Sequence, residues 1–501
     1  MLAGFAAAVL LSAPPARAAA ISRRPVTLSV CDDVQDPMTL DPQKEFSEKN
    51  HTVIQQIFEG LVRFGPDGAI EPALATEWRR LSPTTIQFKL REGVVFHDGE
   101  PFDAESVRFS VARYLDPATR FPALGFIDSI DRVEVVDART VNLVTKYPDG
   151  LLLNRLAGFM VMVPPKYYGG NPEGLLREKP VGSGAFEFKS WTKGSEIVLA
   201  ANRRYWKRGY PMIDELVFKF IPTDKQVEAL LSGEIDLLTT LPGTKTLDVQ
   251  KSTSTYVVKK PTFYTVAGNF NTARKPLSNK RIRQALNLGI DRKALVRYDL
   301  LGNGLAIGTL TLPGEFGRNE ALNPYPYDPE QARRILAEEG YAKGLTLKVL
   351  LKVNAFRTGQ ILAKQLESIG IRMELTSVAD AELFAQLKDR DRWDVAIYDC
   401  PDPMHHAFFI RSIFLAGNSP FSLSADAGID ARLGKLVKTL DADEQRAVSE
   451  ELDAYIHSEY LALPTYQRIR TYGLRRGVVF TPYVSGMPYF YGVAFDGASA
   501  R

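Results

Sequence analysis

The sequence predicts an α/β protein built as two lobes, and two strand–helix–strand units lead to this prediction. The first unit spans residues 216–238 and the second spans residues 345–375. In each unit, a strand of alternating apolar residues is followed by a helix with one apolar face, a glycine and a second strand. Such units pair their strands in parallel through a right-handed crossover. Because more than a hundred residues separate the two units, we place them in different lobes.

Local signals define the first unit. Apolar residues alternate with polar ones over residues 216–220, which indicates a strand. We expect Thr223 to cap the helix that follows and Gly233 to end it. Extended structure then resumes over residues 235–238, and this segment completes the unit.

The second unit repeats this arrangement. Residues 345–353 form the first expected strand. The helix after it places Leu362 and Leu366 on one face, and Gly370 stops it. Residues 371–375 alternate again and form the next expected strand. The two strands of this unit should therefore pair in parallel.

Other segments carry clear helix starts and one hairpin. Asp328 is a suitable N-cap and Pro329 suits the first helical position. Asp103 is expected to cap a second helix. Residues 84–147 are rich in β patterning, with a hairpin expected over residues 133–144. We interpret this region as an inserted α+β subdomain.

Composition favours binding over catalysis. The 501 residues include 62 Lys and Arg against 59 Asp and Glu, a net charge of +3. Proteins that bind nucleic acids usually carry a strong basic excess, so no nucleic-acid partner is expected. The chain has five His and two Cys, few of the residues that serve nucleophilic or metal chemistry. Cys31 and Cys400 could pair in an exported protein, or both could be buried thiols.

The N-terminal residues are typical of a secretory signal peptide. Residues 2–13 are a short apolar run, and an A-x-A sequence follows within residues 16–20. The run is too short to span a bilayer, which needs about 20 apolar residues. We expect residues 1–20 to be removed and the mature protein to be periplasmic. The alternative is a buried N-terminal helix.

Motifs of common catalytic and metal sites are missing from the sequence. It contains no G-x-S-x-G, P-loop lysine or H-E-x-x-H motif. His405 and His406 are adjacent, so their side chains should point in different directions. No Cys-x-x-Cys spacing supports a structural metal. We therefore expect no catalytic residue, no metal site and no cofactor.

Longer motifs occur from residue 71 onward. They are EPALATEW at 71–78, FKLREGVVFHDGEPFDAESV at 88–107, PVGSGAF at 180–186, FNT at 270–272, RQALN at 283–287 and YDPEQA at 327–332. With these motifs the sequence resembles the family 5 extracellular solute-binding proteins of ABC importers, which bind peptides, dipeptides or nickel complexes. The resemblance covers about residues 26–490.

The resemblance implies a two-lobed periplasmic-binding-protein fold of type II, with an extra α+β subdomain on lobe 1. The lobes would be hinge-linked around a ligand cleft, and ligand binding would close the cleft. The chain would cross between lobes near residues 260–269 and return near residues 469–472. The expected boundaries are 1–20 for the signal peptide, 21–50, 160–262 and 473–501 for lobe 1, 51–159 for the inserted subdomain, and 263–472 for lobe 2.

The resemblance also implies a function. The chain would be the periplasmic substrate-binding component of an ABC transporter that imports di- and oligopeptides. It would deliver its solute to permease subunits in the inner membrane, as a monomer and without chemistry. The alternatives are the same fold binding a nickel or other metal–chelator complex, an oligosaccharide or an opine. A secreted hydrolase and an anchored signalling or chaperone protein are more distant alternatives.

One acidic motif gives the sharpest hypothesis about the ligand. Peptide-binding members of the family carry Asp-x-x-Asp-Pro here, and the first Asp holds the peptide's α-ammonium group. Asp399 matches that position, and a carboxylate suits an ammonium because buried charges require partners. The alternative is that Asp399 only ends a strand and caps the next segment. Asp402 is a second candidate, expected mainly to structure the Asp–Pro turn.

The resemblance also suggests which residues would face a bound peptide. Lys352 and Arg357 are the candidates for its carboxylate, and the bidentate geometry of arginine favours Arg357. Either could instead be a solvated surface charge. The remaining candidates are placed near the cleft by the resemblance alone, and they are His51, Gly184, Phe263, Tyr264, Asn269 and Asn418. His51 could equally be a surface residue, and the turn that contains Gly184 could serve as a hinge, a turn or a ligand contact.

Overall fold

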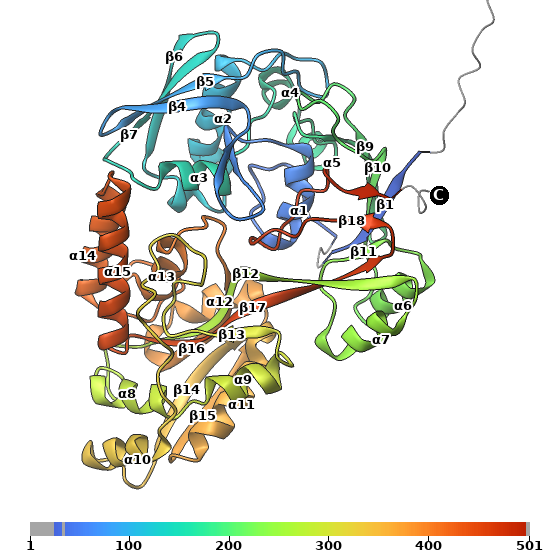
Figure 1. The fold of residues 1–501 in the computed structure, drawn as a ribbon. Coiled ribbons are helices and arrows are strands. Elements are labelled where there is room, and N and C mark those ends of the chain that lie inside the picture. Colours follow the sequence, from blue (N-terminus) through green and yellow to red (C-terminus); the bar gives the residue numbers. More distant parts are fainter. Residues whose placement is uncertain (1–24, 33–35, 497–501) are drawn as a thin grey trace, which may run out of the picture.

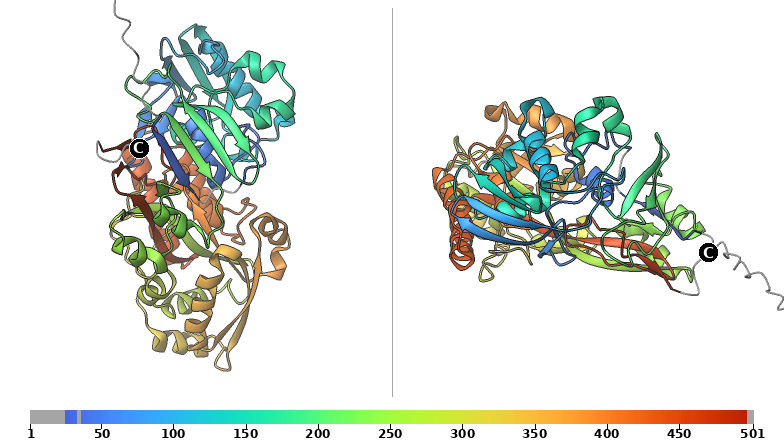
Figure 2. Two further views of the ribbon diagram at one scale, coloured as in Figure 1. Left: turned by 90° about the vertical axis from the view of Figure 1, so that its right-hand side faces the viewer. Right: turned by 90° about the horizontal axis from the view of Figure 1, so that it is seen from above.

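The computed structural model describes residues 25–32 and 36–496. The expected signal peptide, residues 1–20, lies outside the described residues. The chain forms two lobes, the blue and cyan one above the yellow and orange one in Figure 1, and a side view in Figure 2 shows the same division. No helix within the described ranges has the length and apolar character needed to cross a membrane.

One sheet runs through both lobes. Its 11 strands lie in the order β15, β14, β16, β12, β17, β11, β1, β10, β9 and β8, and β13 pairs with β17 off this path. In that order their bounds are Ile371–Val378, Leu345–Lys352, Val395–Pro401, Thr255–Phe270, Ala462–Arg475, Leu237–Leu238, Thr27–Cys31, Glu215–Lys219, Glu196–Ala201, Phe186–Thr192 and, for β13, Gly304–Ala306. The long strands β12 and β17 are antiparallel and cross from one lobe to the other (Figure 1).

The first strand–helix–strand unit forms in the upper lobe with one addition. β10 and β11 are parallel, as predicted, but β1 lies between them and pairs with both. The helix α6 (Gln226–Ser232) begins at Lys225 without a side-chain cap, so the expected cap at Thr223 is wrong. The Lys225 N–H returns to the Pro222 carbonyl in a turn, which delays the helix. Gly233 ends it in the left-handed conformation, as predicted.

The second unit is confirmed in the lower lobe. β14 and β15 pair in parallel along their whole length. The helix α11 (Phe356–Glu367) connects them and buries Leu362 and Leu366. Gly370 follows with φ +88°, in the left-handed region where a glycine is needed. The periodicity of the sequence therefore located all three elements.

The predicted subdomain has a sheet of its own. Its order is β4, β5, β7, β6, with bounds Ala75–Ser82, Thr85–Leu90, Thr140–Thr145 and Ile130–Asp137. β6 and β7 form the predicted hairpin, and α2 (Ala104–Leu115) packs against β6. Asp103 caps α2 and Asp328 caps α10 (Pro329–Glu338), each by accepting a backbone N–H of the first turn. Both caps were predicted.

The remaining elements cover the two lobes. A short hairpin, β2 (Val62–Phe64) and β3 (Ile70–Pro72), contacts α3 (Leu152–Phe159). The other helices are α1 (Glu48–Ile57), α4 (Pro165–Gly170), α5 (Glu173–Glu178), α7 (Thr246–Lys251), α8 (Lys280–Leu288), α9 (Arg292–Asp299), α12 (Asp380–Leu387), α13 (Phe408–Leu415), α14 (Ala427–Lys438) and α15 (Ala442–Ser458). β18 (Val478–Val479) pairs with β19 (Ala494–Phe495).

The hydrophobic core is continuous from the subdomain to the lower lobe. The Phe409 ring centroid lies 4.8 Å from that of Phe126 and 6.1 Å from that of Phe159. The Asn154 side chain donates to the Met404 carbonyl at 2.9 Å. The two lobes therefore touch each other through α3 and the start of α13, and they enclose space between this contact and β12 and β17.

The two cysteines are buried and not joined to each other. Cys31 lies in β1 and Cys400 lies in β16. Three strands of the sheet separate β1 from β16, so a disulfide cannot span the distance. Burial raises the pKa of the Cys400 thiol well above its usual value. Of the two expectations for the cysteines, buried thiols are the one found.

Two glycine substitutions should change stability in opposite directions. Gly370→Ala places a Cβ at φ +88° and should lower the free energy of unfolding by about 1–2 kcal/mol. Gly434→Ala is its matched control, because Gly434 is exposed inside α14 with open space around it. This change should raise the free energy of unfolding by about 0.4–1 kcal/mol. Urea unfolding followed by circular dichroism measures both, and equal effects would contradict the helix stop at Gly370.

Candidate functional site

A cavity of about 440 Å³ lies between the two lobes. Small-molecule sites have volumes of roughly 300–1,000 Å³. Its aromatic lining residues are Phe46, Phe126, Tyr264, Tyr398, Phe409 and Phe421. Its charged lining residues are Lys352, Asp380, Asp399, Arg468 and Arg470. The cavity therefore combines apolar surface with charges of both signs, which suits a small ligand that is itself partly apolar and charged.

An ion pair between Asp399 and Lys352 lies at the centre of the charged wall. Asp399 is near the end of β16, and Lys352 is the last residue of β14, which is parallel to β16. The Lys352 Nζ is 2.7 Å from the Asp399 Oδ1. The Tyr264 hydroxyl, from β12, donates to the Asp399 Oδ2. Three predicted site residues, Asp399, Lys352 and Tyr264, are thus in contact. Asp399 and Lys352 were predicted to bind opposite ends of a ligand, but in the structure they form an ion pair with each other.

The pKa values of this pair show that both side chains are charged. Burial would raise the pKa of Asp399, but the Lys352 ammonium and the hydrogen bonds from Lys352 and Tyr264 outweigh burial and lower it. Burial would lower the pKa of Lys352, but Asp399 and, to a smaller extent, Asp380 raise it. The Asp380 carboxylate, at the start of α12, is 3.4 Å from the Lys352 Nζ. Lys352 therefore has a second acidic neighbour within reach.

Asn269 supports the cavity wall from behind. It is fully buried, and its side chain donates to the Tyr398 hydroxyl at 3.1 Å and accepts from the Leu423 N–H at 2.9 Å. The Tyr398 hydroxyl in turn donates to the Phe421 carbonyl at 2.8 Å. Asn269 does not line the cavity itself, but it fixes two aromatic residues that do.

Arg468 and Arg470 line the cavity, and the sequence analysis did not single them out. They lie two residues apart on β17, so both side chains point to the same face of the strand. The Arg468 guanidinium carbon is 5.4 Å from the Tyr264 ring centroid, and Arg470 donates to the Gly486 carbonyl. The sequence does carry a signal for these two residues, because charged residues alternate here within an otherwise buried strand.

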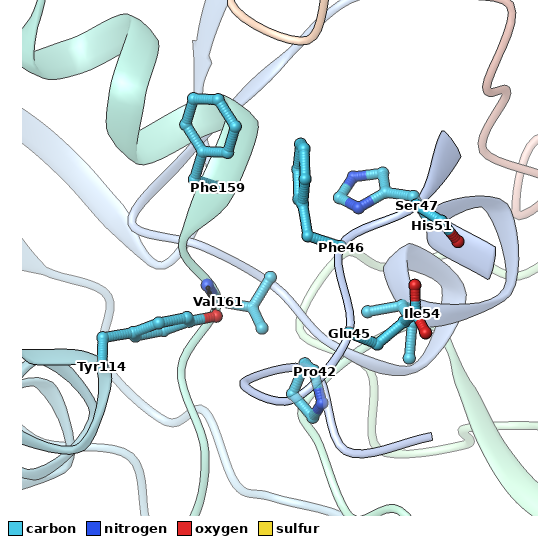
Figure 3. A pocket seen from close by; sticks show the side chains of 9 residues that line it. All are labelled: Pro42, Glu45, Phe46, Ser47, His51, Ile54, Tyr114, Phe159 and Val161. Carbon is cyan, nitrogen blue, oxygen red and sulfur yellow. Dashed lines mark hydrogen bonds between the residues drawn. The ribbon is translucent and has the colours of Figure 1, made fainter. Parts of the chain in front are cut away.

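His51 lines the cavity from α1. Figure 3 shows a smaller hollow beside the cavity, where the Phe46 ring lies between Phe159 and the His51 imidazole. The ring centroid of Phe46 is 4.8 Å from that of Phe159 and 6.4 Å from that of His51. Burial lowers the pKa of His51 to about 4. His51 is therefore a neutral part of the wall at neutral pH.

The adjacent histidines point to different neighbours, as expected. His405 stacks on Phe64, with ring centroids 3.8 Å apart, while the His406 Nε2 faces the Gln445 side chain at 3.4 Å. Burial lowers the pKa of each to about 3. Within the described part of the chain, no group of three His, Cys, Asp or Glu side chains is arranged to hold a metal ion.

Arg357 and Asn418 lie away from the cavity. Arg357 is at the start of α11, where its side chain is 68% exposed. Its guanidinium donates to the Tyr298 carbonyl at 2.7 Å and lies 3.7 Å from the Asp299 carboxylate. Asn418 is exposed in the loop after α13. The helix turns Arg357 toward α9 instead of toward β16. Of the two basic residues predicted to bind a carboxylate, Lys352 is therefore the one that lines the cavity.

Gly184 and Phe263 have packing roles. The Gly184 N–H donates to the Ile57 carbonyl at 2.8 Å, and a Cβ at Gly184 would lie 2.4 Å from the Gln56 carbonyl oxygen. Gly184 is thus needed for close approach to the end of α1. Phe263 is 3% exposed and packs edge-on against His405 at 5.2 Å. Neither residue lines the cavity.

Asp402 structures the turn after β16 and is buried behind the cavity. It accepts the N–H groups of Met404 at 2.7 Å and His406 at 2.9 Å. It is also hydrogen-bonded to the Glu315 carboxyl group. Burial raises the pKa of Asp402 to about 7 and that of Glu315 well above its usual value. Two carboxyl groups in contact share a proton, and Glu315 holds it as the donor.

The protein has two lobes with a mixed-charge cavity between them, the arrangement expected of a two-lobed solute-binding protein. The chain belongs to the bacterial extracellular solute-binding proteins, family 5, because the model for the middle region of that family matches residues 69–420. This membership confirms the family inferred from the sequence motifs.

Individual relatives agree with this assignment. The chain is 27% identical over 491 residues to di/tripeptide-binding protein 2 of Pseudomonas aeruginosa, covering 90% of this chain and 91% of the relative. It is 28% identical over 362 residues to the glutathione-binding protein GsiB of Pectobacterium atrosepticum, covering 70% and 69%. The solved structure of AgaA from A. tumefaciens R10 in complex with agropinic acid is 26% identical, covers 95% and 99%, and has a TM-score of 0.79. The predicted two-lobed α/β fold is therefore confirmed.

The carboxyl pair behind the cavity should make stability depend on pH. In the folded chain Glu315 keeps the shared proton up to at least the pKa of its partner Asp402, about 7, whereas the unfolded chain loses it near pH 4. The free energy of unfolding should therefore fall as pH rises from about 4 to 7, by up to ~1.4 kcal/mol per pH unit for this group. Glu315→Gln, whose amide donates to Asp402 without titrating, should flatten this slope. The control is Glu367→Gln at an exposed position, which should leave the pH dependence of the free energy of unfolding unchanged. If Glu315→Gln shows the same pH dependence as the wild type, the two carboxyl groups do not share a proton.

Proposed function

We propose that the chain is the substrate-binding component of an ABC importer that takes up small peptides. The observation that carries this proposal is the charged Asp399 carboxylate, which lines the cavity between the lobes. The cavity volume and its aromatic lining suit peptides of a few residues. The names of the relatives support the proposal, since one is a di/tripeptide-binding protein and another binds the tripeptide glutathione.

The α-ammonium group of the peptide would bind Asp399 by displacing Lys352. Lys352 would then move to Asp380, whose carboxylate is 3.4 Å from its Nζ. The exchange keeps every charge paired, because one ammonium replaces another at Asp399. Truncating one partner of such a buried pair typically costs about 2–5 kcal/mol. His51 and Tyr264 complete the contacts that we assign to the ligand from the residues singled out in the sequence.

The remaining parts of the proposal concern export and delivery. Residues 1–20 would direct export to the periplasm and be removed there. The mature chain would act as a monomer, without a cofactor and without catalysis, and would deliver its solute to permease subunits in the inner membrane. Lobe 1 (21–50, 160–262 and 473–501), the subdomain (51–159) and lobe 2 (263–472) would be the moving parts. Two of these boundaries fall inside β12 and β17, which suits a hinge.

Ligand binding tests the class of solute. Purified mature protein should be stabilised by di- to pentapeptides in a thermal-shift experiment, because a ligand that binds the native state raises the midpoint by mass action. A nickel–histidine complex, an opine and an oligosaccharide serve as comparison ligands. A shift with one of these and none with any peptide would overturn the peptide assignment. Cleavage products after incubation with peptides would instead indicate a hydrolase.

Asp399→Asn tests the ammonium site. The change should weaken binding of free-amine peptides by at least about thirtyfold, equivalent to the loss of about 2 kcal/mol. Isothermal titration calorimetry measures the affinity, and circular dichroism checks the fold. Asp224→Asn is the matched control, since Asp224 is exposed in the loop before α6. Unchanged peptide affinity in folded Asp399→Asn would rule out the ammonium role.

A further inference from the structure

We propose that the cavity selects peptides with a large apolar side chain, which binds between Phe126 of the upper lobe and Phe409 of the lower lobe. This inference rests on the proposed function and specifies which small peptides bind best. It assigns a part of the peptide to the apolar wall of the cavity, whereas the proposed function assigns one to the charged wall.

The charged wall of the cavity comes from one lobe. Asp399, Lys352 and Tyr264 lie on β16, β14 and β12, and at these positions β16 pairs with β12 and lies beside β14 in the lower lobe. Asp380, at the start of α12, belongs to the same lobe. A ligand ammonium at Asp399 makes the same contacts with these groups whether the lobes are close together or apart. Because a ligand that binds two states equally shifts neither, the ammonium group does not by itself favour closure.

The apolar wall, in contrast, is divided between the lobes. Phe46 and Phe126 line the cavity from the upper lobe, just before α1 and in the short helix Leu124–Phe126. Phe409 and Ile413 line it from α13 of the lower lobe, four residues apart and so on the same face of the helix. The ring centroids of Phe126 and Phe409, one from each lobe, are 4.8 Å apart. An apolar group bound beside these two rings therefore contacts both lobes at once.

The division of the apolar wall makes binding there depend on closure. Phe46 and Phe126 are only partly buried, and both line the cavity. Moving an apolar side chain from water onto such a wall is favourable in proportion to the area that is buried. When the lobes separate, the two halves of the wall separate too, and the ligand side chain loses one of them. The apolar side chain is thus the part of the peptide that binds the closed arrangement better than the open one.

The same wall disfavours a polar side chain of equal size. The side chains of Phe46, Phe126, Phe409 and Ile413 have no hydrogen-bond donor or acceptor. A polar group placed between them gives up its hydrogen bonds to water without replacing them. The polarity of the peptide side chain, at constant size, therefore decides the affinity.

Peptide pairs that differ in one side chain test this inference. The pairs are Leu-Ala against Asn-Ala, Ala-Leu against Ala-Asn and Ala-Leu-Ala against Ala-Asn-Ala, measured by isothermal titration calorimetry at pH 7. The leucine and asparagine side chains have the same number of non-hydrogen atoms and the same branching, so the ratio of dissociation constants reports polarity. We expect the leucine peptide to bind about tenfold or more tightly than its asparagine partner in at least one pair.

Substitutions in both lobes test the assignment to residues. In Phe126→Gln and in Phe409→Gln, the preference for leucine should fall to about threefold or less. Phe46→Gln and Ile413→Gln change the same wall at a second position of each lobe, so that one variant that fails to fold does not decide the result. Phe356→Gln is the matched control and should keep the full preference, because Phe356 is 37% exposed at the start of α11 and does not line the cavity. Circular dichroism checks the fold of each variant.

The outcomes separate this inference from the proposed function. A leucine preference that falls in the variants of both lobes and stays in Phe356→Gln supports the inference. Equal binding within all three pairs would overturn the selection of apolar side chains and leave peptide binding intact. A full leucine preference in the folded variants of either lobe would overturn the assignment to a wall shared by the two lobes. No binding of any of the six peptides would contradict the proposed function, and this inference with it.

Discussion

The pairing of β12 with β17 is the constraint on which both lobes and the cavity depend. The two strands are hydrogen-bonded from Thr255 opposite Arg475 to Asn269 opposite Ala462, and they carry the sheet from one lobe into the other. The ladder is interrupted between Pro261 and Thr265. Irregularities of this kind re-aim side chains and are common beside functional sites. Tyr264, which lies within the interruption, lines the cavity, so the two lobes and the cavity between them share one structural origin.

This interruption determines where neighbouring side chains point. Phe263 is directed into the wall against His405, while Tyr264, the next residue, reaches the cavity and Asp399. The Thr262 hydroxyl donates to the Arg468 carbonyl at 3.0 Å and closes the gap between the strands. The same few residues of β12 therefore anchor the wall, bind the acidic side chain and fix the strand that carries the arginines.

Local patterns in the sequence predicted the elements, and longer-range pairing decided the details. The stop at Gly370 and the cap at Asp328 depend on residues within one helical turn, so sequence alone located them. The insertion of β1 between β10 and β11 joins segments far apart in the sequence, and no local signal reports it. The delayed start of α6 has a local cause, the turn at Pro222, which outweighed the capping tendency of Thr223.

The candidate site, too, could be predicted from local sequence patterns only in part. Lys352 and Asp399 were each recognisable as charges at strand ends, but their pairing requires β14 and β16 to lie side by side in parallel. Arg357 was favoured for its chemistry, yet its direction is set by how α11 packs on α9. Arg468 and Arg470 were missed because the segment that holds them was identified only as a crossing between lobes.

The Lys352–Asp399 pair also explains how the cavity wall can hold a buried carboxylate. Asp399 is 9% exposed, and an unpaired charge at such a position would be costly. Lys352 supplies the cation that pairs with Asp399. An ammonium group that displaced it, as proposed, would gain only the difference between its own interaction with Asp399 and that of Lys352. A solute-binding protein must release its solute as well as bind it. Competition from the Lys352 ammonium for Asp399 would limit the affinity for such a solute. Because Lys352 is within reach of both Asp399 and Asp380, the charges of this wall would stay paired before and after such an exchange.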